Sequence, residues 1–82
     1  MLMHILKGLA KMIKVGTEVG WVWRNGIATG VVQEIYPNKH KIISKGKQIV
    51  RNGTINDPAL VIKHTKGSLV LKLLHEVQEI HK

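Results

Sequence analysis

The sequence predicts a mainly β protein: a small barrel of five or six short antiparallel strands, preceded by an N-terminal amphipathic helix or extension. Three observations predict this class. Short runs of alternating apolar and polar residues recur along the chain, turn residues separate them about every eight to twelve positions, and glycines interrupt two of the runs. The chain has 82 residues and no cysteine, so it has room for one domain with a small core and provides no disulfide framework.

Residues 1–14 form a cationic amphipathic leader, and the barrel domain is expected over residues 15–82. The polar residues of the leader are three, four and three positions apart, the spacing of one helix face: His4, Lys7, Lys11 and Lys14. Lysine interrupts every short apolar run, which excludes a membrane-spanning helix. Three roles stay open for the leader. It docks on the domain or on a second copy of the chain, which would make a homo-oligomer; it is a frayed extension; or it contacts an anionic membrane surface.

The first two strands are expected over residues 17–23 and 27–36. Alternation in the first run places both of its tryptophans on one face. Asn25 and Gly26 follow, and Asn-Gly is the strongest short hairpin signal because both residues tolerate positive φ. The second run ends at a Pro-Asn pair, since proline cannot donate to a β ladder and asparagine suits a turn.

Four further strands and a C-terminal lid complete the expected barrel. Turn residues bound each strand, and the four ranges are 41–44, 47–51, 59–64 and 68–73. The tail, residues 74–82, is expected to form one or two helical turns, because Leu73, Val77 and Ile80 have helical spacing.

Closure of the sheet would solve a problem that short strands create. Open strand edges invite aggregation, and a barrel removes them. Gly20 and Gly30 lie inside strands, where glycine marks bulges and barrel corners. We therefore expect a strongly bent barrel of the SH3/Tudor type.

Five stretches, taken in order and with their spacing, resemble one known family over roughly residues 13–80. They are VGTEVGWVW at 15–23, GIATGVVQEI at 26–35, ISKGKQIVRNGT at 43–54, NDPA at 56–59 and VLK at 70–72. The chain is thus similar to the hypervirulence-associated protein Tudor domain family, formerly a domain of unknown function. The resemblance implies a Tudor/SH3-like barrel and supplies no catalytic residues. The chain departs from the family pattern in its leader and at His75-Glu76-Val77, where the family has a Ser-Glu-Leu-like element.

Three aromatic residues are candidates for ligand binding: Trp21, Trp23 and Tyr36. Tudor domains that bind methylated lysine or arginine hold the cation in a cage of aromatic rings. Such a cage would need all three rings of this chain to converge, leaving none for the core. Packing in the core or at its rim is therefore favoured, and a stacking surface for bases or peptide aromatics stays open.

Basic residues give the chain a formal charge of +8, from 13 Lys and Arg against 5 Asp and Glu. Such a balance favours acidic partners. Candidates gather at two predicted hairpins and include one neighbouring amide: Arg24, Lys45, Lys47, Arg51 and Asn52, with Lys39 and Lys41 just before the second hairpin. Together they could neutralise phosphates of a nucleic acid. The competing interpretation is a solvated sheet edge that lysine protects from pairing.

Asp57 lies in the longest turn-rich stretch and precedes a proline. Its carboxylate can accept hydrogen bonds from loop amides, and Arg51 could pair with it. We expect Asp57 to be a structural clamp of this loop, with ligand binding as the alternative.

The sequence offers no catalytic centre, metal site or cofactor motif. Five carboxylates, no cysteine and no ordered Ser/His/Asp set leave no acid–base pair or nucleophile, and the five histidines lack ligand spacing. We therefore expect a non-enzymatic, cytoplasmic binding or adaptor module whose ligand is a protein or peptide. The alternative is non-specific RNA or DNA binding through the lysine-rich strands.

Overall fold

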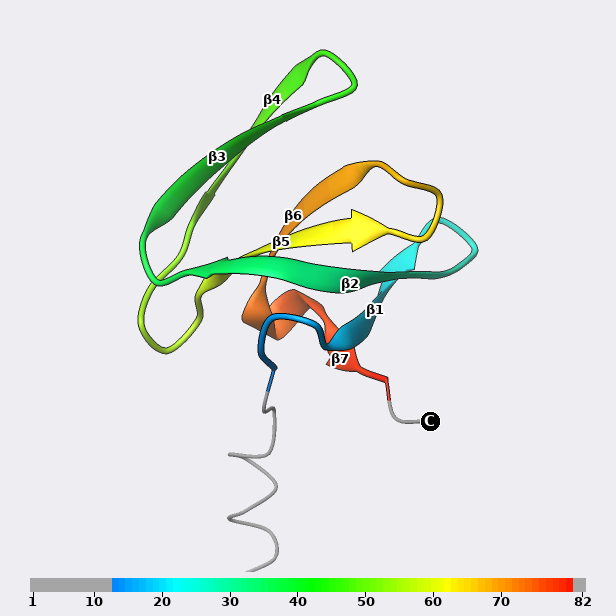
Figure 1. Cartoon of the computed structure of the whole chain (residues 1–82), viewed down its shortest axis with the longest axis horizontal. Coiled ribbons are helices and arrows are strands. Elements are labelled where there is room, and N and C mark those ends of the chain that lie inside the picture. Colours follow the sequence, from blue (N-terminus) through cyan, green and yellow to red (C-terminus); the bar gives the residue numbers. More distant parts are fainter. Residues whose placement is uncertain (1–12, 81–82) are drawn as a thin grey trace, which may run out of the picture.

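The computed structural model describes residues 13–80, and within this range the chain is mainly β (Figure 1). Seven antiparallel strands and one 3-10 turn follow one another, with no α-helix in the described range. This confirms the predicted fold class. The elements are β1 (Glu18–Trp23), β2 (Gly26–Tyr36), β3 (Lys39–Ser44), β4 (Lys47–Asn52), β5 (Ala59–His64), β6 (Leu69–Leu73), η1 (Leu74–Glu76) and β7 (Gln78–Glu79).

The main sheet has five strands in the order β6-β5-β2-β1-β7. The long strand β2 joins its two halves, because it pairs with β1 along its first part and with β5 along its second. Gly30 lies where these pairings overlap, opposite Val19 on β1 and His64 on β5. A Cβ atom at Gly30 would lie 2.6 Å from the carbonyl oxygen of Lys63, so only glycine permits this close approach of the strands.

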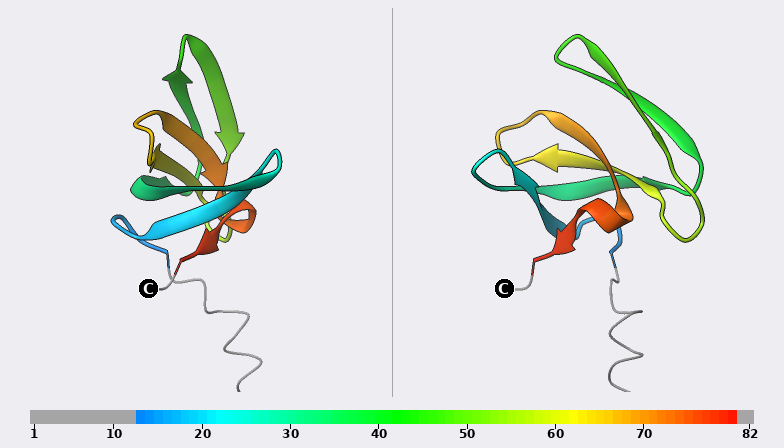
Figure 2. Two further views of the ribbon diagram at one scale, coloured as in Figure 1. Left: turned by 90° about the vertical axis from the view of Figure 1, so that its right-hand side faces the viewer. Right: turned by 180° about the vertical axis from the view of Figure 1, so that it is seen from behind.

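The β3–β4 hairpin is an insertion between two paired strands. Tyr36 at the end of β2 is opposite Ala59 at the start of β5, so the chain leaves and returns at one point. The N–H of Gly53 donates to the carbonyl of Asn38 there, at 3.2 Å. Both views in Figure 2 show the hairpin extending beyond the main sheet. It forms a separate two-stranded sheet.

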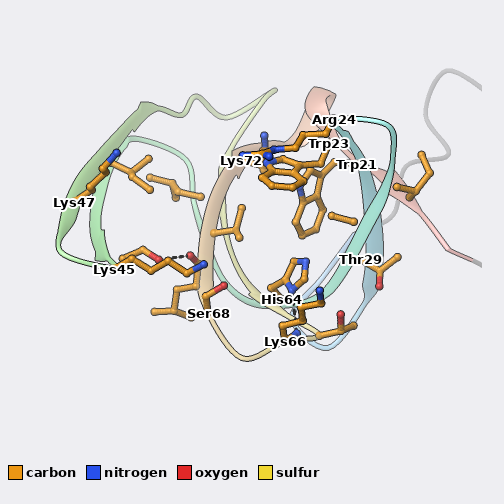
Figure 3. A pocket seen from close by; sticks show the side chains of 18 of the residues that line it. Trp21, Trp23, Arg24, Thr29, Lys45, Lys47, His64, Lys66, Ser68 and Lys72 are labelled. Atoms are coloured by element: carbon orange, nitrogen blue, oxygen red, sulfur yellow. Dashed lines mark hydrogen bonds between the residues drawn. The ribbon is translucent and has the colours of Figure 1, made fainter.

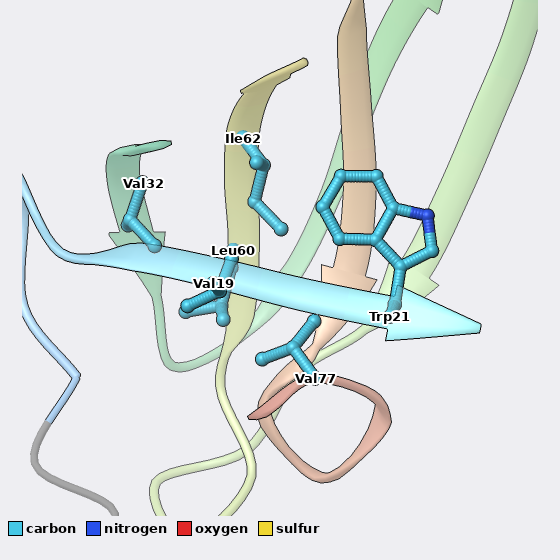
Figure 4. Packing of buried hydrophobic residues seen from close by; sticks show 6 residues of the cluster. All are labelled: Val19, Trp21, Val32, Leu60, Ile62 and Val77. Carbon is cyan, nitrogen blue, oxygen red and sulfur yellow. The ribbon is translucent and has the colours of Figure 1, made fainter. Parts of the chain in front are cut away.

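Two apolar clusters lie on opposite faces of β5. The first fills the curl of the main sheet (Figure 4) and consists of Val19, Trp21, Val32, Leu60, Ile62 and Val77. The second lies under the inserted hairpin and consists of Ile42, Ala59, Val61 and Leu71. Strand β5 is therefore buried on both faces, which explains its continuous apolar run in place of alternation.

The C-terminal tail differs from the predicted helical turns. After one 3-10 turn, residues 78 and 79 form β7 and pair with Gly20 and Val19 of β1. Val77 between them is 1% exposed and joins the first cluster. The side chain of Glu76 accepts the N–H of Leu73 and holds the turn closed. The tail covers the first cluster, as expected of a lid, but as one 3-10 turn followed by a two-residue strand at the edge of the main sheet.

The predicted leader lies outside the described residues over positions 1–12. Its last two residues are described: Ile13 packs against the first cluster, and the N–H of Lys14 donates to the hydroxyl of Thr17 at 3.0 Å. In the part of the chain that the structure describes, no helix has the length and apolar character to cross a membrane.

Candidate binding pocket

A pocket of about 1000 Å³ lies between the inserted hairpin, β6 and the β1–β2 turn. Strand β6 runs through the middle of it (Figure 3). Lys45 and Lys47 lie on one side of β6, which we call the hairpin half. Trp21, Trp23 and His64 lie on the other side, which we call the barrel half. The pocket thus exists because the β3–β4 hairpin is inserted between the paired strands β2 and β5.

Six basic side chains line this pocket. Residues 13–80 contain ten Lys and Arg residues, so more than half of them gather here, and none of the described lining residues is acidic. Concentrated charge of one sign between low-dielectric walls raises the local concentration of ligands of the opposite sign. The six are Arg24, Lys45, Lys47, Arg51, Lys66 and Lys72.

The lining between these cations is largely apolar. Leu71 is 1% exposed and belongs to the second cluster, whereas Leu69 and Ile27 expose 39% and 67% of their surface. Ile49 on β4 and Val70 on β6 complete this lining. The pocket therefore combines an apolar floor with cationic walls.

The two tryptophans share a strand face but have different environments. Trp21 is 4% exposed and meets the ring of His64 edge-on, with 5.9 Å between ring centroids. Trp23, at the end of β1, is 54% exposed. The guanidinium carbon of Arg24 lies 4.3 Å from the Trp23 ring centroid, a cation–π contact. Trp21 is a core residue, and Trp23 is an accessible ring at the pocket wall.

Tyr36 does not line this pocket. Its ring stacks on His40 with centroids 3.7 Å apart, and its hydroxyl donates to Glu34 at 2.6 Å. This hydrogen bond, followed by desolvation and by the charge of Glu34, raises the pKa of Tyr36. The three aromatic residues thus do not converge, and a cationic pocket without an acidic wall would repel a methylammonium group.

The strand register sorts the lysines of the inserted hairpin onto two faces. Lys47 and Arg51 line the pocket, and Lys45 follows in the turn with φ of 53°. Lys39 and Lys41 line a separate, smaller depression with His40, Gln48 and Val50. Asn52 pairs with Lys39 in the ladder and lines neither.

Asp57 binds the 3-10 turn and does not line the pocket. Its carboxylate accepts the backbone N–H of His75 at 2.9 Å, and the second oxygen lies 2.7 Å from Nδ1 of the same residue. These contacts tie the loop of Asp57 to η1, and the residue contacted is His75. Arg51, the partner considered from the sequence, instead lies 3.6 Å from Glu76.

Sequence reasoning did not single out the histidine and two of the lysines that line the pocket: His64, Lys66 and Lys72. His64 ends β5, and its Nδ1 accepts the backbone N–H of Lys66 at 2.9 Å. The available signal was the position of this histidine directly before a tight turn. Within residues 13–80, no three His, Asp or Glu side chains group closely enough to hold a metal ion.

The family model described as the hypervirulence associated proteins TUDOR domain matches residues 16–77. The chain belongs to this family. The match covers β1 to η1, and therefore every described element that lines the pocket. No curated protein and no solved structure matches this Tudor domain. Membership in the family makes it a small binding module.

Proposed function

We propose that this Tudor domain is a non-enzymatic binding module whose pocket takes an extended, acidic segment of a protein. The gathering of six cations around an apolar floor carries this proposal. Their charge favours an anionic ligand, and the floor favours one that also presents apolar groups. A peptide in which acidic and apolar side chains alternate has both properties, because successive side chains of an extended chain point to opposite sides.

Single-stranded nucleic acid is the second candidate, and Trp23 favours it. An exposed ring beside cations can stack a base while lysines neutralise phosphates. Successive bases need successive rings, however, and the other tryptophan of the pocket is buried. An acidic peptide therefore fits the pocket better.

Charge reversal on the two faces of the inserted hairpin tests the location of binding. Lys45→Glu/Lys47→Glu changes the pocket face, and Lys39→Glu/Lys41→Glu makes the same change in net charge on the opposite face. Calorimetric titration with end-blocked octaglutamate should show loss of binding for the first variant. The second should bind within about threefold of the wild type, because Lys39 and Lys41 lie on the face of the hairpin that does not line the pocket. Equal losses would refute a defined pocket.

A second titration distinguishes the two ligand classes. Oligothymidylate that neutralised all six cations would weaken with a log–log salt slope of about −4. A peptide that alternates Glu and Leu should keep part of its affinity at about 0.2 M salt, because contacts with the apolar floor are not screened. Tighter binding of oligothymidylate at that salt concentration would favour single-stranded nucleic acid over the peptide as the ligand.

The cytoplasmic location and a homo-oligomer through residues 1–14 stay predictions.

A further inference from the structure

His64 is a pocket residue whose backbone and ring are both held by contacts. Two hydrogen bonds across the β5–β6 turn hold its backbone. Its N–H donates to the carbonyl oxygen of Ser68 at 2.8 Å, and its carbonyl oxygen accepts the N–H of Gly67 at 2.7 Å. Its ring meets Trp21 edge-on at an interplanar angle of 69°. Figure 3 shows the ring between Lys66 and Trp21, inside the barrel half. The hydrogen bonds at the β5–β6 turn and the contact with the buried ring of Trp21 thus fix the position of this imidazole.

One hydrogen bond determines which ring nitrogen carries the proton. Nδ1 lies 2.9 Å from the backbone nitrogen of Lys66. A backbone N–H can only donate, so Nδ1 must be the unprotonated acceptor. The proton of the neutral ring then resides on Nε2. None of the described residues accepts a hydrogen bond from this second nitrogen.

This donor differs in kind from the surrounding cations. Lysine side chains lose much rotamer entropy when a ligand orders them, and their ammonium groups are compact charges without a directional preference. The imidazole of His64 is already ordered and presents one directional N–H. A directional donor within a cationic field is suited to orienting a carboxylate, because the field attracts the group and the N–H selects its position.

We infer that the barrel half is a carboxylate subsite and that His64 binds the ligand there. Nε2–H donates to one carboxylate oxygen, and Arg24, Lys66 and Lys72 supply the positive field. The inference rests on the proposed function and deepens it by naming the group that is bound and its donor. His64 acts as a neutral donor, since a proton on Nδ1 would face the N–H of Lys66 and break the bond that orients the ring.

Two substitutions separate the binding role of His64 from its structural role. In His64→Asn, the amide oxygen lies near the position of Nδ1 and can accept the N–H of Lys66, but no donor reaches the Nε2 position. In His64→Gln, the longer amide places an N–H near Nε2. We expect His64→Asn to bind end-blocked octaglutamate about tenfold more weakly, the value of one hydrogen bond to a charged group. His64→Gln should lose about threefold or less.

Nitrogen NMR of the wild-type imidazole gives a test that needs no variant. The free protein should show Nδ1 as the unprotonated nitrogen, and octaglutamate should shift the Nε2–H signal of His64. A blocked octaglutamine should leave the signal unmoved. An octaglutamine with a free C-terminus tests whether an α-carboxylate is accepted as well as a side-chain carboxylate, and a shift with this peptide alone would assign the subsite to chain ends.

The outcomes distinguish failure of the subsite from failure of the proposed function. If octaglutamate binds wild type and His64→Asn equally, while Lys45→Glu/Lys47→Glu abolishes binding, the pocket stands and the subsite is refuted. If neither octaglutamate nor the peptide that alternates Glu and Leu binds the wild type, both are refuted. If oligothymidylate moves the Nε2–H signal and octaglutamate does not, the subsite takes phosphate and the carboxylate assignment is wrong.

Discussion

Gly53 is the residue through which the inserted hairpin joins the main sheet, and Gly53→Ala should be strongly destabilising. A Cβ atom there would lie 2.6 Å from both the backbone nitrogen of Ala59 and the carbonyl oxygen of Tyr36. It would also lie 2.9 Å from the carbonyl oxygen of Asn38. All three atoms belong to backbone, so no side chain can rotate away. Relief requires β2 and β5 to separate where they pair.

The expected cost lies at the upper end of the range for overpacking. Extra methyl groups in well-packed sites cost about 1–3 kcal/mol, and we expect about 3 kcal/mol at Gly53 because the clashing atoms are backbone. At about 4–8 °C per kcal/mol for a domain of this size, the melting temperature should fall by about 12–24 °C. Far-ultraviolet circular dichroism during thermal unfolding measures this change.

Gly26→Ala is the matched control for the Gly53 prediction. It lies at the start of β2, without a positive φ, and its Cβ would meet no atom within 4 Å. The same change there should be neutral or stabilising by about 0.4–1 kcal/mol, through a less flexible unfolded chain. Melting temperatures of the two variants within about 4 °C of each other would show that the backbone atoms of Tyr36, Asn38 and Ala59 do not lie as close to Gly53 as the structure places them.

Three further predictions concern single contacts. Trp21→Ala should cost about 3–5 kcal/mol in chemical denaturation, because the ring is buried, whereas Trp23→Ala should cost less than about 1 kcal/mol, because that ring is exposed. Asp57→Ala removes two hydrogen bonds to the 3-10 turn, so it should lower the free energy of unfolding by about 1–2 kcal/mol. Tyr36 should ionise above 10.0, and Glu34→Ala should lower its pKa toward that value in an absorbance titration of this single tyrosine. The stabilisation from their bond is complete below pH 10.0 and is lost as pH rises through the raised pKa.

The strands could be predicted from the sequence because their signals are local. Asn25 and Gly26 lie at the first hairpin as predicted, but the turn residues are Arg24 and Asn25, and the positive φ of 55° falls on Arg24. The glycine at position 30 marks the bend of β2. The tail could not be predicted in the same way. The spacing of Val77 and Ile80 is compatible with a helix, yet pairing with β1 decides the conformation of residues 78 and 79. That pairing joins residues far apart in the sequence, and the local spacing of apolar residues does not predict such pairing.

The pocket could be predicted only in part. Basic residues of one hairpin, such as Lys47 and Arg51, line it as a set because a shared strand face is a local property. Tyr36 lies elsewhere because alternation does not show which strands meet. Lys72 and His64 were missed for the converse reason. They reach the pocket only because the inserted hairpin folds over β5 and β6, which brings together residues far apart in sequence.

Mapping of backbone amide shifts with end-blocked octaglutamate tests the central claim most directly. The pocket predicts that the largest shifts belong to residues around Arg24, Lys47 and Lys66. It also predicts that Lys39 and Lys41, on the other face of the same hairpin, stay near their free values. Shifts of equal size on both faces of the hairpin would mean that acidic chains bind through diffuse charge, and the pocket would then have no role in binding.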